Sequence, residues 1–153
     1  MRYWVTTHYP PFVGEKEHPD VYLRAIHKEV GEALSIGDCV IVYECGQGKA
    51  VKNKKRLRGR QGVVYYGSVS KTLHEDSEAK PEDYTDGTST LWNWSAPIRV
   101  LSRSGFLSRS ELAVCLGYEP TYVFHGFGTK HSGLMVIKPE QYENIVGKFH
   151  AGK

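Results

Sequence analysis

Short runs of hydrophobic residues, many of them β-branched or aromatic, recur along the chain between polar segments that contain glycine and proline. This pattern is typical of β-strands that bury one or both faces. It predicts strands at residues 3–6, 39–45, 62–70, 91–101 and 134–137. The first strand is expected to end before Pro10 and Pro11, because proline has no amide hydrogen to donate to a neighbouring strand.

Helical spacing of hydrophobic residues is found early in the chain. Leu23, Ile26, Val30 and Leu34 recur at steps of three and four residues. This spacing predicts an amphipathic helix, which Pro19 can open and which ends before residue 36.

Two further helices are predicted in the second half of the chain. Ser108 and Glu111 have the spacing of a capping box, in which the serine hydroxyl accepts from the amide three residues on and the glutamate reaches back. The helix after this box is expected to end at Gly117. Pro139 opens a final short helix that runs through residue 146.

The length of 153 residues favours a single domain that spans residues 1–153. A domain of this size can bury a core without disulfides or metal. Five or six strands with mostly short connections favour a mainly antiparallel sheet curled into a small barrel. About three helices are expected to pack outside it. The class is therefore mixed, α+β or α/β, and periodicity alone does not choose between the two.

Composition narrows the class of protein. With 40% hydrophobic and 24% charged residues the chain is expected to be globular, and no apolar run of about 18 residues is present to cross a bilayer. The N-terminus reads directly into a strand rather than a secretory signal, so we expect a cytoplasmic protein. Its three cysteines include no Cys-x-x-Cys pair, which argues against a disulfide framework and a zinc knuckle.

Seven lysines and arginines lie within residues 49–60, with no acidic residue among them. They are Lys49, Lys52, Lys54, Lys55, Arg56, Arg58 and Arg60. Placed between two strands, they predict a hairpin with a cationic tip that neutralises nucleic-acid phosphates and releases counterions. The alternative is a solvated loop that keeps the domain soluble. Acidic residues at 75–86 offset this charge. A one-sided positive electrostatic field is possible if the basic and the acidic stretch lie on different faces of the protein.

Several short motifs, taken in order, resemble an EVE domain. They are Tyr3, Trp4 and Val5 at the start, Ile36, Gly37 and Asp38 before the 39–43 strand, Gly62, Val63 and Val64 with Gly67, Ser68 and Val69, residues 133–137, and Pro139, Glu140, Gln141 and Tyr142. The resemblance spans nearly the whole chain. EVE domains belong to the PUA-like superfamily with YTH and ASCH domains. The resemblance implies a pseudo-barrel with a pocket for a flipped, modified base, as in readers of modified cytosine in DNA.

A pocket for an extruded base needs aromatic faces for stacking and polar groups for the base edge. Trp4, Trp92 and Trp94 are the first stacking candidates, with Tyr65 and then Tyr66 and Tyr9 behind them. The alternative for each is a place in the core. Thr6, Thr7 and His8 follow the first strand, where the resemblance implies polar pocket groups; ordinary turn chemistry before Pro10 is the alternative.

A glycine-rich segment at 125–133 is the remaining candidate site. His125, Gly126, Gly128, His131 and Ser132 combine flexible backbone with polar groups. Its exposed amides could cradle a phosphate, although its spacing matches no nucleotide-binding fingerprint, or the segment could serve as a structural link.

The functional prediction is a non-enzymatic module without metal or cofactor that binds nucleic acid, DNA rather than RNA, and recognises a modified base. Arg103, Arg109 and Lys130 are expected to add phosphate contacts to those of residues 49–60. The alternatives are an enzyme acting on a nucleotide or modified nucleoside through residues 125–133, an RNA-binding PUA-like module, or a protein that binds an acidic partner.

Overall fold

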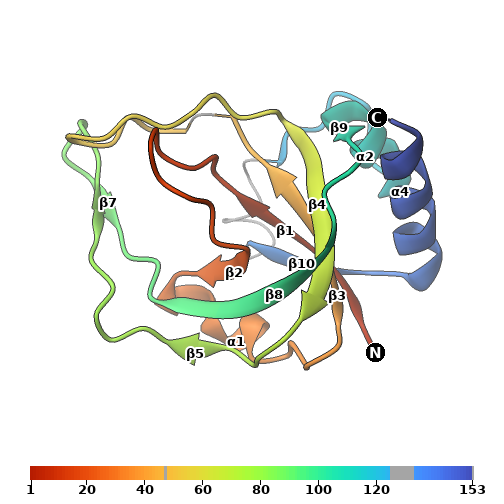
Figure 1. Ribbon diagram of the computed structural model, residues 1–153, viewed down its shortest axis with the longest axis horizontal. Helices are drawn as coiled ribbons and strands as arrows, with labels where there is room; N and C mark the ends of the chain where they lie inside the picture. The colour runs from red at the N-terminus through yellow and green to blue at the C-terminus, as the bar shows by residue number, and fades with distance from the viewer. Residues whose placement is uncertain (47, 125–132, 153) are drawn as a thin grey trace.

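The main structural element of the protein is one strongly curled β-sheet (Figure 1). The computed structural model describes residues 1–46, 48–124 and 133–152. The strands follow one another in the order β10 (Leu134–Ile137), β1 (Tyr3–His8), β3 (Cys39–Glu44), β4 (Gly62–Val69), β8 (Trp94–Ser102) and β2 (Asp20–Leu23). Neighbours are antiparallel except β1 and β3, which are parallel. The predicted mixed, mainly antiparallel sheet curled into a pseudo-barrel is confirmed.

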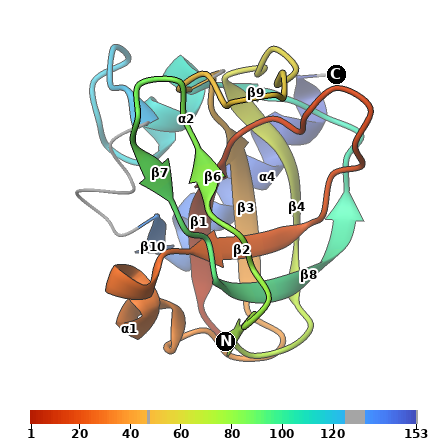
Figure 2. The same ribbon diagram turned by 90° about the vertical axis from the view of Figure 1, so that its left-hand side faces the viewer.

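Four short strands complete the β-structure of the described residues. β5 (His74–Glu75) pairs with β8, and β9 (Leu107–Ser108) pairs with β4. β6 (Glu82–Asp83) and β7 (Ser89–Thr90) form a separate two-stranded sheet. This small sheet lies on the side of the barrel away from α2 (Arg109–Cys115) and α4 (Pro139–Ala151) (Figures 1 and 2).

The curled sheet separates two hydrophobic clusters, because successive side chains of a strand point to opposite faces. On β3, Ile41 joins the cluster that also contains residues of α2 and α4. Its neighbours Val40 and Val42 join the second cluster, inside the curl. Helices α2 and α4 therefore cover the outer face of the sheet, and the inner face surrounds the second hydrophobic cluster (Figure 1).

The two predicted C-terminal helices are confirmed. Ser108 Oγ accepts from the Glu111 amide at 3.3 Å and Glu111 Oε1 accepts from the Ser108 amide at 3.4 Å, which completes the capping box of α2. Gly117 follows the helix with a φ of +84°, a conformation that suits glycine. α4 begins at Pro139 and is longer than expected. In the described part of the chain, no helix combines the length and apolar character that crossing a membrane requires.

The prediction of one helix from residue 19 to residue 34 is wrong in its first part. Asp20–Leu23 forms β2, in which Val21 and Leu23 are buried and pair with β8. Only a 3-10 turn (Ala25–His27) and the short α1 (Lys28–Gly31) follow. Leu23 fits a helical stripe with Ile26 but also a strand alternation with Val21, and pairing with β8 decided between them.

Asp38 joins the start of the chain to the turn before β3. Its Oδ1 accepts from the Arg2 amide at 3.0 Å, and its Oδ2 accepts from the Trp4 indole and the Ser35 amide at 3.0 Å each. Burial alone would raise the pKa of Asp38, but these donors outweigh it and hold the pKa below its usual range. Gly37 makes the turn possible, with a φ of +92°.

Candidate functional site

A cavity of about 510 Å³ opens inside the curl. Its wall begins at the end of β1 and continues through the following loop to β2, and it includes residues of the β6–β7 sheet. Volumes of this order are typical of small-molecule sites. The two sheets thus enclose a space that the hydrophobic clusters leave unfilled.

Aromatic side chains line much of this cavity. They are Tyr9, Phe12, Tyr22, Tyr84 and Trp92, joined by histidines at 8, 18 and 27. Of the tryptophans proposed for stacking, Trp92 is the one that lines the cavity, and it lies just before β8 in a half-buried position. The cavity can therefore offer flat faces to a planar ligand.

The structure brings four of the proposed base-pocket residues to the cavity: Thr7, His8, Trp92 and the lower-ranked Tyr9. Thr6 and Trp4 lie elsewhere. Thr6 is buried and its hydroxyl donates to the Gly133 carbonyl at 2.7 Å. Trp4 is buried in the inner cluster, where its indole is held by Asp38.

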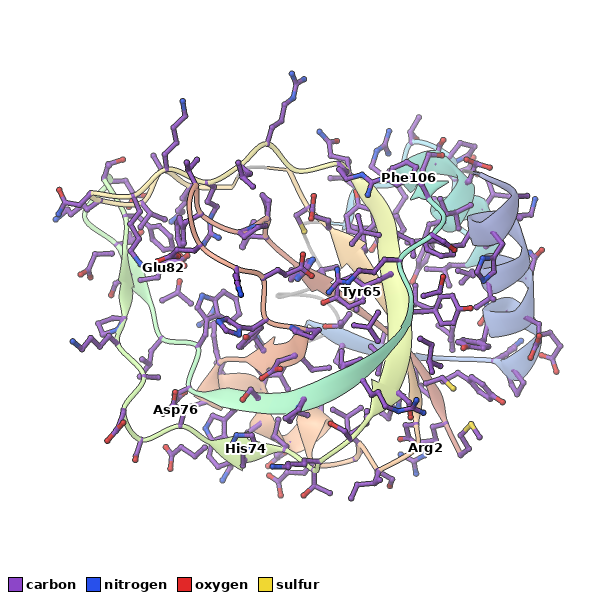
Figure 3. All side chains as sticks on the ribbon, viewed as in Figure 1. Arg2, Tyr65, His74, Asp76, Glu82 and Phe106 are labelled. Atoms are coloured by element: carbon purple, nitrogen blue, oxygen red, sulfur yellow. The ribbon has the colours of Figure 1, made fainter. Side chains whose placement is uncertain are left out.

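Trp94 and Tyr65 have packing contacts. Trp94 packs against the inner cluster, with the Lys28 ammonium 5.0 Å from its ring centre. Tyr65 projects from β4 into the curl (Figure 3), and its fully buried ring packs against His8 in a T-shaped arrangement with the ring centres 5.7 Å apart. Arg103 covers the Tyr65 ring at 4.3 Å. Neither Trp94 nor Tyr65 lines the cavity, so base stacking is left to other residues.

Sequence reasoning missed three of the aromatic wall residues. Phe12 and Tyr84 come from polar, proline-containing segments, and Tyr22 from the stretch assigned to a helix. Large aromatics in otherwise polar loops are a usable signal, because such loops seldom bury them without a packing partner or ligand. Arg56 supplies one partner, with its guanidinium 4.3 Å from the Phe12 ring centre.

The basic residues 49–60 connect β3 to β4, so the predicted hairpin is confirmed. Ion pairs connect its tip to neighbouring segments. Lys49 pairs with Asp86 at 3.2 Å and Lys54 with Glu15 at 3.0 Å. Arg56 pairs with Glu82, whose position Figure 3 shows. The acidic stretch therefore touches the basic one, and the condition for a one-sided electrostatic field, that the two stretches lie on different faces, is not met.

Three of the exposed cations of this loop have neither an ion pair nor an aromatic partner among the described residues. Lys52, Lys55 and Arg58 form no ion pair with any described residue. Arg60 lays its guanidinium over the Phe106 ring at 4.6 Å. The loop thus presents three cations next to the cavity wall that Lys49 and Arg56 help to form.

The other proposed phosphate contacts are dispersed. Arg103 pairs with Glu17 at 3.3 Å beside the cavity. Arg109 donates to the Tyr122 carbonyl at 2.6 Å from α2, on the outer face of the sheet. Lys130 and the loop candidates at 125, 126, 128, 131 and 132 lie outside the described residues.

Cys45 is the thiol that reaches the cavity wall. Burial raises the pKa of Cys45 to about 12, so almost none of it is thiolate at neutral pH. Cys115, on α2, also has a raised pKa because of burial. Neither thiol has the lowered pKa of a cysteine nucleophile.

Comparisons with known proteins identify the fold. No protein-family model and no curated protein matches the chain. Among solved structures, protein Atu2648 from Agrobacterium tumefaciens has a TM-score of 0.58 at 15% identity, over 97% of this chain and 92% of that one. A hypothetical protein from Leishmania major has a TM-score of 0.58 at 12% identity, covering 99% and 96%.

A third similar structure is human THYN1 in complex with DNA that contains 5-methylcytosine. Its TM-score is 0.55 at 9% identity, with 97% of each chain covered. Together with the curled sheet and its outer helices, these similarities show that the chain has the PUA-like fold.

Proposed function

We propose that this protein is an EVE-type module that binds nucleic acid and takes one extruded, modified base into the cavity. The observation that carries the proposal is the aromatic-walled cavity of about 510 Å³, with exposed cations on the adjoining loop. An extruded base requires a snug pocket with stacking faces and polar groups for its edge. The aromatic wall, with Thr7, His8 and Glu17, offers both kinds of group.

In this proposal the exposed cations of the 49–60 loop bind the nucleic-acid backbone, and the cavity binds the base. Lys52, Lys55 and Arg58 hold the phosphates, which are the same at every position of a strand. The cavity carries selectivity, because only there does a base edge meet protein groups. THYN1, which shares the fold, was crystallised with DNA containing 5-methylcytosine, and this supports a nucleic-acid ligand and favours DNA over RNA.

The phosphate contacts can be tested by salt dependence. Changing Lys52, Lys55 and Arg58 together to alanine is expected to weaken binding to every duplex of one length by a similar factor. It should also reduce the slope of log affinity against log salt by up to about 2.7, at about 0.9 per lost contact. Affinities are measured by fluorescence anisotropy at several salt concentrations.

Lys148→Ala is the matched control, since it removes an exposed cation from α4 on the outer face. It should leave the slope unchanged. A wild-type affinity that does not change with salt, or a triple variant with the wild-type slope, would contradict the phosphate contacts.

A further inference from the structure

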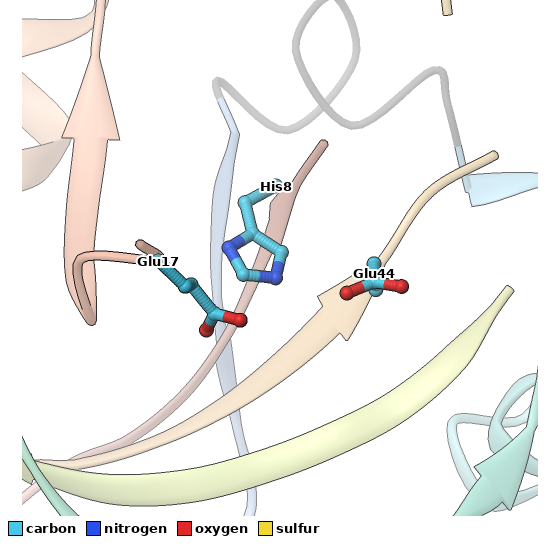
Figure 4. Close-up of side chains that lie close together, drawn as sticks. All are labelled: His8, Glu17 and Glu44. Atoms are coloured by element: carbon cyan, nitrogen blue, oxygen red, sulfur yellow. The ribbon is translucent and has the colours of Figure 1, made fainter. Parts of the chain in front are cut away.

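Three metal-ligating side chains converge beside the cavity (Figure 4). His8 ends β1 and Glu44 ends β3, and the parallel register pairs the two residues directly. Glu17 approaches from the loop between β1 and β2. One ligand atom from each residue lies within 4.8 Å of the other two. Residues far apart in sequence are therefore assembled by the strand pairing of the fold.

One nitrogen of this cluster lacks a partner. His8 Nε2 is buried and has no hydrogen bond within the described part of the chain. The Tyr65 ring and the imidazole pack in a T-shaped arrangement, which is a packing contact. A buried polar atom without a partner is uncommon and calls for an explanation, such as an ion that the site holds. The lone pair of a neutral imidazole is a good ligand for such an ion.

The two carboxylates of the cluster have one ion pair between them among the described residues. Glu44 is 6% exposed and accepts from the Arg60 amide at 2.9 Å, but it has no ion pair among the described residues. Glu17 has one, with Arg103. Among the described residues, only Arg103 forms an ion pair with the cluster. Arg56 and Arg60 act on it from farther away, and Arg56 is itself paired with Glu82, so a divalent cation would add neutralising charge directly at the two carboxylates. Buried charges are ordinarily paired or bound to metal.

We propose that His8, Glu17 and Glu44 bind a divalent transition-metal ion of the zinc or manganese type. One imidazole nitrogen with two carboxylates suits these ions, whereas Mg²⁺ and Ca²⁺ prefer oxygen ligands alone. Ligands on a tetrahedral zinc lie roughly 3.4 Å apart, given bonds of about 2.1 Å. The side chains must therefore draw together, and Glu17 can do so because it lies on a loop.

A bound ion would keep coordination positions open. Three protein ligands leave at least one position of a tetrahedral ion free. His8 and Glu17 also line the cavity, so a ligand in the cavity could reach that position. The site stands on its own geometry and does not depend on the proposed nucleic-acid function.

The test is calorimetric titration of the chelator-treated full chain with ZnCl₂ at pH 7. We expect one ion per chain with a dissociation constant in the micromolar range or below, and binding of Mg²⁺ at least 100-fold weaker. Glu17→Gln and Glu44→Gln should each weaken zinc binding at least tenfold. Glu15→Gln is the matched control, because it changes an exposed carboxylate of the same loop and should leave zinc binding unchanged.

A second measurement needs no variant and so does not depend on how the variants fold. Substoichiometric Mn²⁺ should broaden the amide resonances around residues 8, 17 and 44 first. The absence of zinc binding by the wild-type chain, wild-type affinity in both glutamine variants, or broadening centred on the exposed His18 or His74 would each overturn the proposal.

Discussion

Replacing Trp92 with alanine is expected to weaken binding to an oligonucleotide whose base enters the cavity by roughly 5- to 150-fold. The physical reason is that stacking of a base on an aromatic side chain contributes about 1–3 kcal/mol. Trp92 lines the cavity from the segment just before β8. Anisotropy titrations at one salt concentration measure the effect, and the salt slope should stay at its wild-type value because no phosphate contact is removed.

Trp94→Ala is the matched control for this change. Trp94 is the same residue type only two positions away, but it packs against the inner cluster and does not line the cavity. Its removal should lower the free energy of unfolding and leave the affinity of the folded protein within about threefold. Equal losses of affinity in the two variants, or no loss with Trp92→Ala, would contradict stacking on Trp92.

Asp38→Asn is expected to lower the free energy of unfolding by about 2–4 kcal/mol, as measured by urea denaturation at pH 7. The carboxylate is 2% exposed and accepts from three donors, of which the Trp4 indole is one. An asparagine has a single accepting oxygen, so at least one of these donors loses its partner. Asp83→Asn, at an exposed carboxylate of β6, should change the same quantity by less than about 0.5 kcal/mol.

The effect of Asp38 should also depend on pH in a defined direction. Because the folded-state pKa of Asp38 is lowered, its stabilisation is present above the unfolded value of about 3.9 and is lost as the pH falls through the folded value. The difference between the wild-type chain and Asp38→Asn should therefore shrink below about pH 4. A difference that stays constant from pH 7 to pH 3, or one below 0.5 kcal/mol at pH 7, would contradict this role.

Much of the fold could be predicted from the sequence, because the signals for its elements are local. The capping box at Ser108 and the proline at 139 each mark a helix start whatever the rest of the chain does. Residues 20–23 were different: Leu23 fits both a helical stripe with Ile26 and a strand alternation with Val21, and the pairing with β8 made the segment a strand. Such pairing is a tertiary effect that a local pattern does not contain.

The motifs that suggested the EVE resemblance have a structural explanation. Trp4 was a candidate for stacking, but its indole donates to Asp38, and the Gly37 turn places that carboxylate. The Trp and Gly-Asp motifs are therefore the two ends of one buried hydrogen-bond network. These motifs stabilise the fold and do not line the cavity. They were therefore a better guide to the fold than to the residues of the pocket.

The candidate site was predicted only in part. Thr7, His8, Tyr9 and Trp92 reach the cavity. Of the remaining aromatic wall, Phe12 and Tyr84 come from segments without a periodic signal, and Tyr22 from the stretch assigned to a helix. The cluster of His8 with two glutamates was missed entirely, because its members are brought together by the parallel pairing of β1 and β3 and by a loop. Residues 8, 17 and 44 have no local metal-ligand spacing, so the sequence alone did not group them.

The entry of a single base into the cavity can be measured most directly with duplexes that differ at one position only. That position carries unmodified cytosine, one of several modified bases, or an abasic sugar, and affinities are compared at one salt concentration. We predict that at least one modified base binds ten or more times tighter than the abasic duplex, and that Trp92→Ala removes most of this preference. Affinities equal within twofold across the whole set, in a protein whose binding still falls steeply with salt, would show that only phosphates are bound and would contradict base recognition in the cavity.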